Sequence, residues 1–359
     1  GLFDALGDLG ISRHSTAAIG DAENDHSLLG ACELGVAVAD AVPSLRAAAD
    51  VVLPEAGSAA LARFLLGPAV LSDETPEPRR FQAVLGTFED GSPARLPASG
   101  VNVLVTGGSM SGKSYLTGLL AERLLALGYS LCVLDPEGDH VAVGRLRGVL
   151  AVGGNEPLPG PDQLPRLIEH RFGSLVVDLS FLDPSEKTAY ARAALVELSA
   201  LWNDTGLPHW LFLDEAQVAL NLAHLPVEGF DPSRPGTCLT TWRPEDLPPD
   251  VVGSLDVVLD LGAEETTGLP EWARPAGMRP PPGQALLSRR SRPGPRRFTV
   301  SRRASPHARH LHKYIGGSLP PEQRFFFRSG AGATGREAGN VEEFHRELRR
   351  AEADVVRHH

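Results

Sequence analysis

The sequence VNVLVTGGSMSGKSYLTGLL, residues 101–120, decides the fold of this chain. An apolar run that favours a β-strand, 101–105, leads into a loop with the pattern G-x-x-x-x-G-K-S. The loop passes directly into a helical pattern of leucines that begins at Leu116. Such a loop between a strand and a helix is typical of a binding site for the phosphate groups of a nucleotide. The alternative is a glycine- and serine-rich turn that binds nothing.

Each residue type in this loop has a chemical reason. Glycines let the backbone turn its N–H groups towards a triphosphate, and the helix that follows adds its positive N-terminal end. Lys113 is expected to reach the β- and γ-phosphate oxygens, and the hydroxyl of Ser114 to bind the Mg²⁺ ion that bridges them. The sequence therefore predicts ATP and Mg²⁺ as ligands. The predicted nucleotide contacts are Gly107, Gly108, Ser109, Met110, Ser111, Gly112, Lys113, Ser114 and Tyr115.

Size and composition limit the classes of protein to which this chain could belong. A chain of 359 residues has room for two or three domains. The net charge of −11 argues against a surface that is basic throughout, as in a general nucleic-acid coat, although local basic patches stay open. Cys32, Cys132 and Cys238 lie far apart without metal or redox spacing, so we expect reduced core residues in a cytoplasmic protein. No apolar run approaches the roughly 18 residues of a membrane helix, and no leader peptide is recognised.

Further apolar runs follow the loop and alternate with helical patterns. This alternation predicts an α/β fold in which a parallel sheet is covered by helices on both faces. The expected strands are residues 130–134, 175–177, 210–213, 238–240 and 257–259, the main helix is 184–204, and hairpins are expected over 81–96 and 283–303.

Acidic side chains gather where these strands end. In a parallel sheet, ligands bind outside the carboxyl ends of the strands. Asp214 is expected to hold Mg²⁺ through water, and Glu215 to orient or deprotonate the attacking water. An acidic pair that caps a helix is the alternative. The segment 135–139, with three acids, is either a solvated turn or a neighbour of the nucleotide.

The fifth strand also ends in polar residues. A side chain there, Thr240 or Thr241, could sense the γ-phosphate, and Arg243 could stabilise the transition state in its own subunit or across a subunit boundary. The competing interpretation is that Arg243 forms salt bridges with the acids at the strand ends.

The motifs GGSMSGKS, VLDPEGD, LFLDEAQ and TTWRPEDLP, in this order, resemble the HerA/FtsK branch of P-loop ATPases over residues 81–303. The resemblance implies a sheet whose sensor strand lies between the strands of the phosphate loop and of Asp214. It also implies a homo-oligomer, often a hexameric ring, that moves DNA or protein. Where the family commonly has glutamine after threonine this chain has Trp242, so we take Thr241 as the sensor.

Residues 1–66 form a segment of their own, with an acidic cluster at 20–25 after a short strand. The run AIGDAENDHSLLGACELGVAVADAVPSLRAAADVVL resembles the fourth motif of haloacid dehalogenase phosphatases, which implies that Asp21 binds Mg²⁺ with Asn24 and Asp25. An acidic helix-capping loop is the alternative. The aspartate nucleophile in D-x-D is absent from this chain, so we expect a partial, Rossmann-like C-terminal fragment without phosphatase activity of its own.

The remaining segments complete the expected domain organisation. Residues 67–79 are a proline-rich, acidic linker, 80–303 the ATPase domain, and 304–359 a truncated accessory segment with an amphipathic helix at 340–359. Seven arginines and no acid lie between 289 and 303, which indicates either a solvated basic hairpin or an arginine supplied to a neighbour or to a phosphate backbone. His307, His310 and His312 favour a capping helix over a metal site.

The sequence therefore predicts a Mg²⁺-dependent ATPase, oligomeric, fused to a haloacid dehalogenase-like segment. Two alternatives stay open. One is a regulatory module that binds ATP with little turnover, and the other is a DNA translocase.

Overall fold

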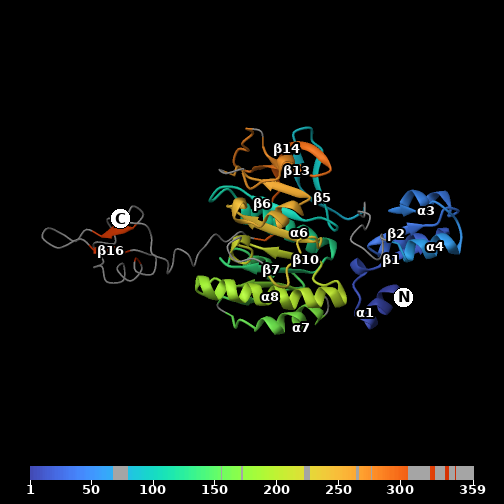
Figure 1. Cartoon of the computed structure of the whole chain (residues 1–359), viewed down its shortest axis with the longest axis horizontal. Helices are drawn as coiled ribbons and strands as arrows, with labels where there is room; N and C mark the ends of the chain where they lie inside the picture. Colours follow the sequence, from blue (N-terminus) through green and yellow to red (C-terminus); the bar gives the residue numbers. More distant parts are fainter. Residues whose placement is uncertain are drawn as a thin grey trace.

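The computed structural model describes residues 1–67, 80–154, 156–170, 173–221, 227–263, 267–275, 277–305, 324–327, 336–338 and 344. In these ranges the strands form three sheets, in the orders β1-β2-β3, β5-β4-β14-β13-β12-β6-β11-β10-β7-β9-β8 and β15-β16 (Figure 1). The eleven-stranded sheet is the centre of the molecule and carries the phosphate loop. The predicted α/β class is therefore confirmed.

The N-terminal segment is a small α/β unit with parallel strands. A short 3₁₀ turn, Glu23–Asp25, leads directly into its second helix, α2. The elements are α1 Leu2–Leu9, β1 Ala17–Gly20, α2 His26–Ala31, β2 Leu34–Ala37, α3 Pro43–Ala48, β3 Val51–Val52 and α4 Ser58–Leu65.

The central sheet combines a parallel core with antiparallel hairpins. Strands β12, β6, β11, β10, β7, β9 and β8 run parallel, and the two predicted hairpins, β4–β5 and β13–β14, join the same sheet beyond β12. The sensor strand β11 lies between β6 and β10, as the resemblance implies. The strands are β4 Gln82–Phe88, β5 Pro93–Pro97, β6 Val103–Thr106, β7 Leu131–Asp135, β8 Val149–Gly153, β9 Ser174–Asp178, β10 Trp210–Leu213, β11 Thr237–Thr241, β12 Val257–Asp260, β13 Gln284–Arg289 and β14 Arg292–Val300.

One strand of the central sheet was not predicted. β8 pairs in parallel with β9 at the edge of the sheet, and most of its side chains are partly exposed. A buried parallel strand reads as a continuous apolar run, whereas an edge strand of five residues between glycines gives only a weak signal.

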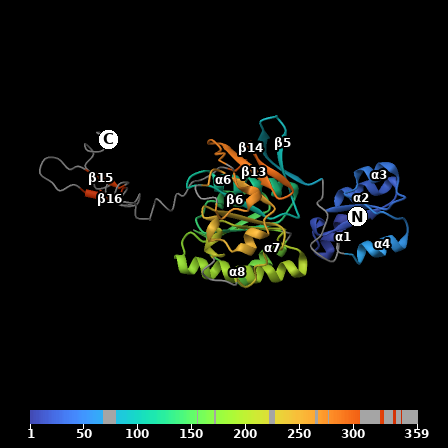
Figure 2. The same ribbon diagram turned by 45° about the horizontal axis from the view of Figure 1, so that its top comes forward.

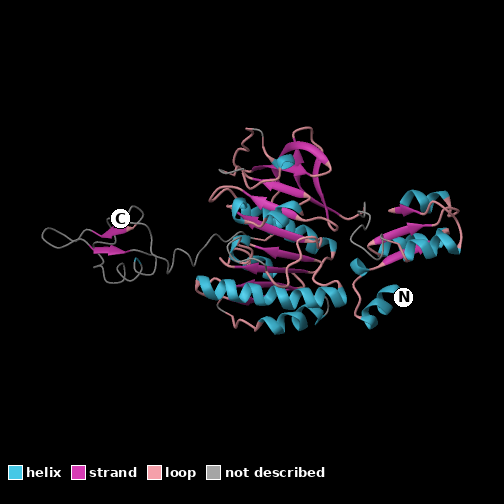
Figure 3. Ribbon diagram, viewed as in Figure 1, coloured by secondary structure: helices cyan, strands magenta, loops and turns pink. Residues whose placement is uncertain are grey.

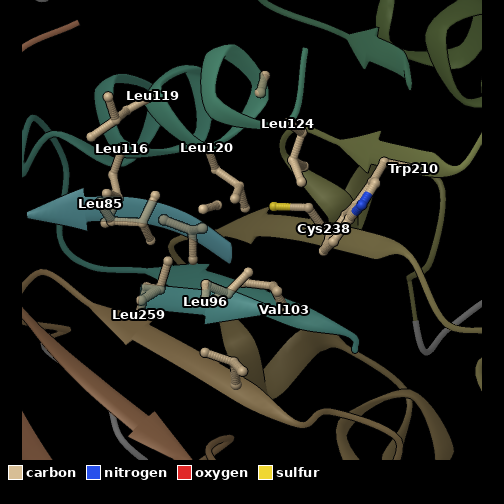
Figure 4. Close-up of a cluster of buried hydrophobic side chains, with 14 of the residues drawn as sticks. Leu85, Leu96, Val103, Leu116, Leu119, Leu120, Leu124, Trp210, Cys238 and Leu259 are labelled. Atoms are coloured by element: carbon tan, nitrogen blue, oxygen red, sulfur yellow. The ribbon is translucent and has the colours of Figure 1, made fainter. Parts of the chain in front are cut away.

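Helices cover both faces of the parallel strands (Figure 3). Because side chains alternate along a strand, Val103 and Val105 of β6 pack with helix α6 (Lys113–Leu127), and Leu104 packs on the other face with α7 (Leu164–Glu169) and α8 (Pro184–Thr205). Figure 4 shows the α6 leucines directed at the sheet. The helix α9 spans Pro249–Gly253.

All three cysteines are free and buried, which confirms their interpretation as core residues. None of the described helices is both long and apolar enough to cross a lipid bilayer. The hairpin of β15 (Phe325–Phe327) and β16 (Arg336–Ala338) is described. The linker residues 68–79, the three histidines His307, His310 and His312, and all but Phe344 of the predicted final helix lie outside the described residues.

A buried ion pair fixes the end of the basic hairpin to α6. Arg303 donates from Nε to Glu122 at 2.9 Å, and both side chains are buried. Glu122 also accepts from the backbone N–H groups of Ala304 and Ser305. These bonds, with that of Arg303, hold the pKa of Glu122 below its usual value although burial acts to raise it. Gly118 makes room for the guanidinium, which lies within 2.6 Å of where a Cβ would stand.

The Arg303–Glu122 pair yields a stability prediction. Replacing Arg303 with methionine leaves a buried carboxylate without its cation, so we expect a loss of about 3–5 kcal/mol in the free energy of unfolding. The matched control is Arg297→Met, since Arg297 pairs with Glu89 at 2.8 Å on the exposed surface and is worth about 0–1 kcal/mol. Urea unfolding of both variants measures the difference. Equal losses would show that the buried pair does not anchor this segment.

A second buried cluster joins the N-terminal segment to the central sheet, and we call it the junction: His14, Glu33, Tyr129 and His209. His14 stacks on Tyr129 with ring centroids 3.8 Å apart and contacts Glu33 through Nδ1 at 2.6 Å. The hydroxyl of Tyr129 donates to both oxygens of Glu33 at 2.9 Å. The last turn of α6 is also engaged, because Arg13 donates to the carbonyl of Leu127 at 2.7 Å.

These contacts pack the N-terminal segment against the part of the chain that forms the central sheet (Figures 1 and 2). A cation near the carbonyl end of a helix is stabilised by the helix dipole. Arg80, the first described residue after the linker, adds bonds to the carbonyls of Leu29, Cys32 and Glu33 and pairs with Asp50 at 2.7 Å.

The junction predicts sensitivity to acid. Burial, together with the neighbouring His14, lowers the pKa of His209 from 6.5 to about 3, while its Nδ1 accepts from the N–H of Ser130. Because His209 titrates near pH 6.5 when unfolded, its neutral form stabilises the fold above that pH, and this contribution is lost as pH falls from 6.5 towards 3.

The measurement is the melting temperature between pH 4 and pH 7. His209→Asn keeps an acceptor for the Ser130 N–H and removes the titration, so we expect a shallower decrease of Tm below pH 6.5 than in the wild type. His26→Asn, at a partly exposed histidine, is the control and should follow the wild-type curve. Parallel curves for all three proteins would contradict the assignment.

Candidate active site

The phosphate loop occupies the carboxyl end of β6. The strand ends at Thr106, and α6 begins at Lys113 after Gly112, which has a left-handed φ of 103°. No side chain caps the start of α6, so its first N–H groups face the loop. Met110, at the tip, is 79 % exposed and also has a positive φ of 58°. The loop therefore has the open backbone that an anion site requires.

Lys113 is held inside this loop. Its ammonium donates to the carbonyls of Gly107 at 3.2 Å and Gly108 at 3.0 Å. Burial lowers the pKa of Lys113, and the nearby carboxylates of Glu215, Asp214 and Asp139 oppose that effect. Those electrostatic interactions place the lysine and the acids of two other strand ends in one site.

Ser114 contacts the acidic loop after β7. Its hydroxyl donates to Asp139 Oδ2 at 2.7 Å. Asp135 shapes that loop, because its two oxygens accept the N–H groups of Glu137, Gly138, Asp139 and His140 at 2.7–3.3 Å. The segment is therefore an ordered turn that presents Asp139 to the phosphate loop. Asp135 and Asp139 are buried, which contradicts the solvated turn, and a place beside the nucleotide stays a prediction.

His140 lies between this turn and Asp214. Its Nε2 is 3.5 Å from Asp214 Oδ2, and both side chains are buried. Burial alone would lower the pKa of His140, but the carboxylates of Asp214 and Asp135 raise it to about 9. The imidazole is thus a cation at neutral pH and offsets the charge of Asp214.

One ligand atom from each of Asp135, His140 and Asp214 lies within 4.8 Å of the other two. Metal binding would require a neutral histidine, whereas the carboxylates around His140 favour its protonated form. Asp135 also uses both oxygens on the backbone. We therefore interpret this group as an internal ion pair that holds Asp214. Asp214 Oδ1 is buried and has no hydrogen-bond partner among the described residues, so it is the oxygen left for a ligand.

Glu215 has a strained backbone. Its φ of 45° and ψ of 57° are left-handed, and among the described residues the only other non-glycine with positive φ is Met110. Such strain costs on the order of 1 kcal/mol and concentrates at functional sites. Burial raises the pKa of Glu215, and the charge of Asp214 adds to the increase. A raised pKa suits a general base.

A hydrogen-bonded chain connects Glu215 with the sensor strand, and we call it the relay: Glu215, Gln217 and Thr241. Gln217 Nε2 donates to Glu215 Oε2 at 2.6 Å, and Thr241 Oγ1 donates to Gln217 Oε1 at 2.7 Å. Thr240 faces the opposite way, because its hydroxyl bonds Thr117 of α6 at 2.8 Å. The geometry thus favours Thr241 over Thr240 as the residue that communicates with the acids.

Two residues predicted to belong to the site, Arg243 and Tyr115, have partners outside it. Arg243 pairs with Glu245 at 3.3 Å and Asp246 at 3.0 Å, acids of its own loop and not of the strand ends. Tyr115, a predicted nucleotide contact, donates its hydroxyl to the carbonyl of Ser301 and accepts the N–H of Arg303. In this structure Tyr115 secures the end of the basic hairpin.

The acidic cluster of the N-terminal segment forms a local turn. Asp25 Oδ2 accepts the N–H groups of Asp21 at 2.9 Å and Ala22 at 3.1 Å, bonds that lower the pKa of Asp25, and Asn24 donates to Asp25 Oδ1 at 3.4 Å. Gly20 allows the approach, because a Cβ there would lie 2.5 Å from Asp25. This arrangement fits the capping loop, and a Mg²⁺ role for the three residues stays a prediction.

Sequence reasoning missed the roles of His140 and Gln217. Both follow acids that the motifs singled out, His140 after Asp139 and Gln217 two positions after Glu215. The signal for Gln217 was its place in DEAQ, next to a predicted base. For His140 there was none, because its effect depends on β7 lying beside β10.

Residues 1–65 match the family model of haloacid dehalogenase-like hydrolases. No curated protein matches the chain. The solved structures that match include the genome packaging NTPase B204 of Sulfolobus turreted icosahedral virus 2 in complex with ATP-gammaS, at 16 % identity, TM-score 0.42, and 56 % and 98 % coverage of this chain and that one.

Two bacterial structures match as well. The cytoplasmic domain of the Thermomonospora curvata type VII secretion ATPase EccC has 14 % identity and a TM-score of 0.42, with 64 % of this chain and 27 % of that one covered. VirB4 of Thermoanaerobacter pseudethanolicus has 14 % identity and a TM-score of 0.39, with 62 % and 96 % covered. From its strand order and phosphate loop, the central part of the chain has the fold of a P-loop ATPase, and it follows a segment that matches haloacid dehalogenase-like hydrolases.

Proposed function

We propose that residues 80–303 bind ATP with Mg²⁺ and hydrolyse the bond between its β- and γ-phosphates. One observation carries the proposal. Lys113, Ser114, Asp214 and Glu215, from two strand ends separated by β11, converge on one edge of the sheet with Asp139 between them. Residues 1–66 and 304–359 are proposed as separate units joined to this domain, the first through the linker 67–79.

The donor set fits Mg²⁺. This ion prefers oxygen ligands and keeps several waters. The Ser114 hydroxyl and the carboxylates of Asp139 and Asp214 offer oxygens, and Asp214 Oδ1 is buried without a partner among the described residues. Ser114 and Asp214 would hold the ion, which supplies charge neutralisation to the phosphates when bound.

The chain's own residues supply the rest of the chemistry. Lys113 leaves the carbonyls of the loop for the more strongly charged phosphate oxygens, and the loop N–H groups bind the remaining charge. Glu215, with its raised pKa, accepts a proton from the attacking water, and the relay fixes the orientation of its carboxylate.

The catalytic prediction concerns these two residues. Glu215→Gln keeps the shape but removes the base, so we expect kcat to decrease about 100-fold or more with ATP still bound. Lys113→Ala is expected to weaken ATP binding and to reduce hydrolysis about 100-fold. Phosphate release and the affinity for a fluorescent ATP analogue measure the two effects, with and without Mg²⁺.

The exposed Glu228→Gln is the control for charge and should match the wild type. Equal rates in all four proteins would refute the proposal. Tight ATP binding with negligible wild-type turnover would instead identify a regulatory module, and hydrolysis that requires DNA would identify a translocase.

The relay gives a paired prediction. Thr241→Val removes the hydroxyl that orients Gln217, so we expect about a 10-fold lower kcat with little change in ATP affinity. Thr240→Val is the matched substitution on the same strand. It leaves the buried hydroxyl of Thr117 unpaired, so Tm decreases while kcat per folded molecule stays at the wild-type value. The relay has no catalytic role if both variants keep wild-type kcat.

A homo-oligomer is part of the proposal. Arg243 is 44 % exposed in its side chain, and its ion pairs in the described part of the chain are with flanking acids of its own loop. Surface ion pairs of this kind are worth about 0–1 kcal/mol, so the arginine is available to a phosphate group in its own subunit or in a neighbour.

A further inference from the structure

A second basic site lies at the other end of the sheet. A cavity of about 540 Å³ opens between β5 and the β13–β14 hairpin, which lie together in Figure 2. Four arginines line it, Arg95, Arg289, Arg292 and Arg296, over an apolar base that includes Phe88 and Leu287. No carboxylate is among the lining residues. In a chain with a net charge of −11, this groove is a local concentration of positive charge.

The strand register separates the groove from the phosphate loop. Arg289 is the partner of Val257 at the start of β12, and Val257 pairs with Val103 at the start of β6. The phosphate loop follows the other end of β6, after Thr106. The groove is thus at the amino-terminal edge of the parallel strands, opposite the edge that carries the phosphate loop.

Positive charges are crowded at the groove. Arg289 and Arg292 are direct partners across the hairpin, and like charges placed opposite each other destabilise a sheet. Arg296 pairs with Asp90 at 3.0 Å, its guanidinium lying 3.7 Å from the Phe88 ring centroid. In the ranges that the structure describes, Arg95 and Arg292 have exposed side chains and no ion pair. A bound anion would relieve this repulsion.

We propose that this groove binds a small ligand with two or more phosphate groups. Guanidinium groups form paired, charge-assisted hydrogen bonds with phosphate oxygens. The volume lies in the usual range of small-molecule sites, about 300–1,000 Å³. Glu89 and Asp90, in the turn beside the groove, oppose the extension of a longer polyanion past it. The ligand is therefore a compact phosphate compound and not the backbone of a nucleic-acid strand.

The test uses inorganic tripolyphosphate and calorimetry in a Lys113→Ala background, which weakens binding at the phosphate loop. Arg95→Gln with Arg292→Gln should weaken tripolyphosphate binding at least tenfold. Both arginines are exposed and one replacement removes a like-charge contact, so Tm should not decrease. The control, Arg145→Gln with Arg147→Gln, removes the same charge from exposed positions elsewhere and should leave binding unchanged.

Three results would overturn the proposal. One is the absence of tripolyphosphate binding in the Lys113→Ala protein. Another is an equal loss of binding in both arginine pairs, which would indicate general charge attraction. The last is that a 20-nucleotide single strand binds more tightly than tripolyphosphate and that its binding depends on Arg95 and Arg292. That result would assign the groove to a nucleic-acid backbone. A nucleoside diphosphate tested beside pyrophosphate shows whether the groove also recognises a base, and in either case a Kd that depends on the two arginines supports the site.

Discussion

The candidate active site depends on the parallel register of β6, β11, β10 and β7. Parallel strands bring their carboxyl ends to one edge, where β6, β11 and β7 end in Thr106, Thr241 and Asp135 and β10 is followed directly by Asp214. The cost of this arrangement is crowded negative charge in a buried place. Two cations offset it from within the site, Lys113 in the phosphate loop and His140 beside Asp214. The sheet therefore positions the acidic side chains of the site, and Lys113 and His140 reduce the free-energy cost of burying them close together.

Side chains from α6 connect this edge with the rest of the chain. The helix begins at Lys113 in the phosphate loop and ends at Leu127, whose carbonyl accepts from Arg13 of the N-terminal segment. Midway, Glu122 holds the end of the basic hairpin through Arg303. One helix thus contacts the nucleotide site, the junction and the second hairpin. The N-terminal segment, which the sequence predicts to be separated from the central domain by a linker, is packed against that domain by buried polar contacts.

Most arginines of the basic hairpin have partners within the fold. This bears on the choice, left open by the sequence, between a solvated hairpin and one that supplies an arginine to a neighbour or a phosphate backbone. Arg297 pairs with Glu89, Arg290 lies 4.0 Å from Asp256, and Arg303 is buried with Glu122. The composition of 289–303 suggested one uniform basic surface. The fold divides it into arginines that hold the sheet together and a smaller set, around Arg95 and Arg292, that lines a groove.

The sequence by itself determined the strands of the central sheet except β8, the phosphate loop and the acids that follow β10, because each is encoded by local periodicity or by a short motif. The choice of Thr241 as the sensor rested only on the resemblance to HerA/FtsK-type ATPases. Tertiary structure decided what no local pattern encodes: the relay through Gln217, the charge of His140, the hydrogen bonds of Tyr115 with Ser301 and Arg303, and the groove. Each of these joins residues distant in sequence or buried by other elements, and both pairing and desolvation exist only once the sheet has formed.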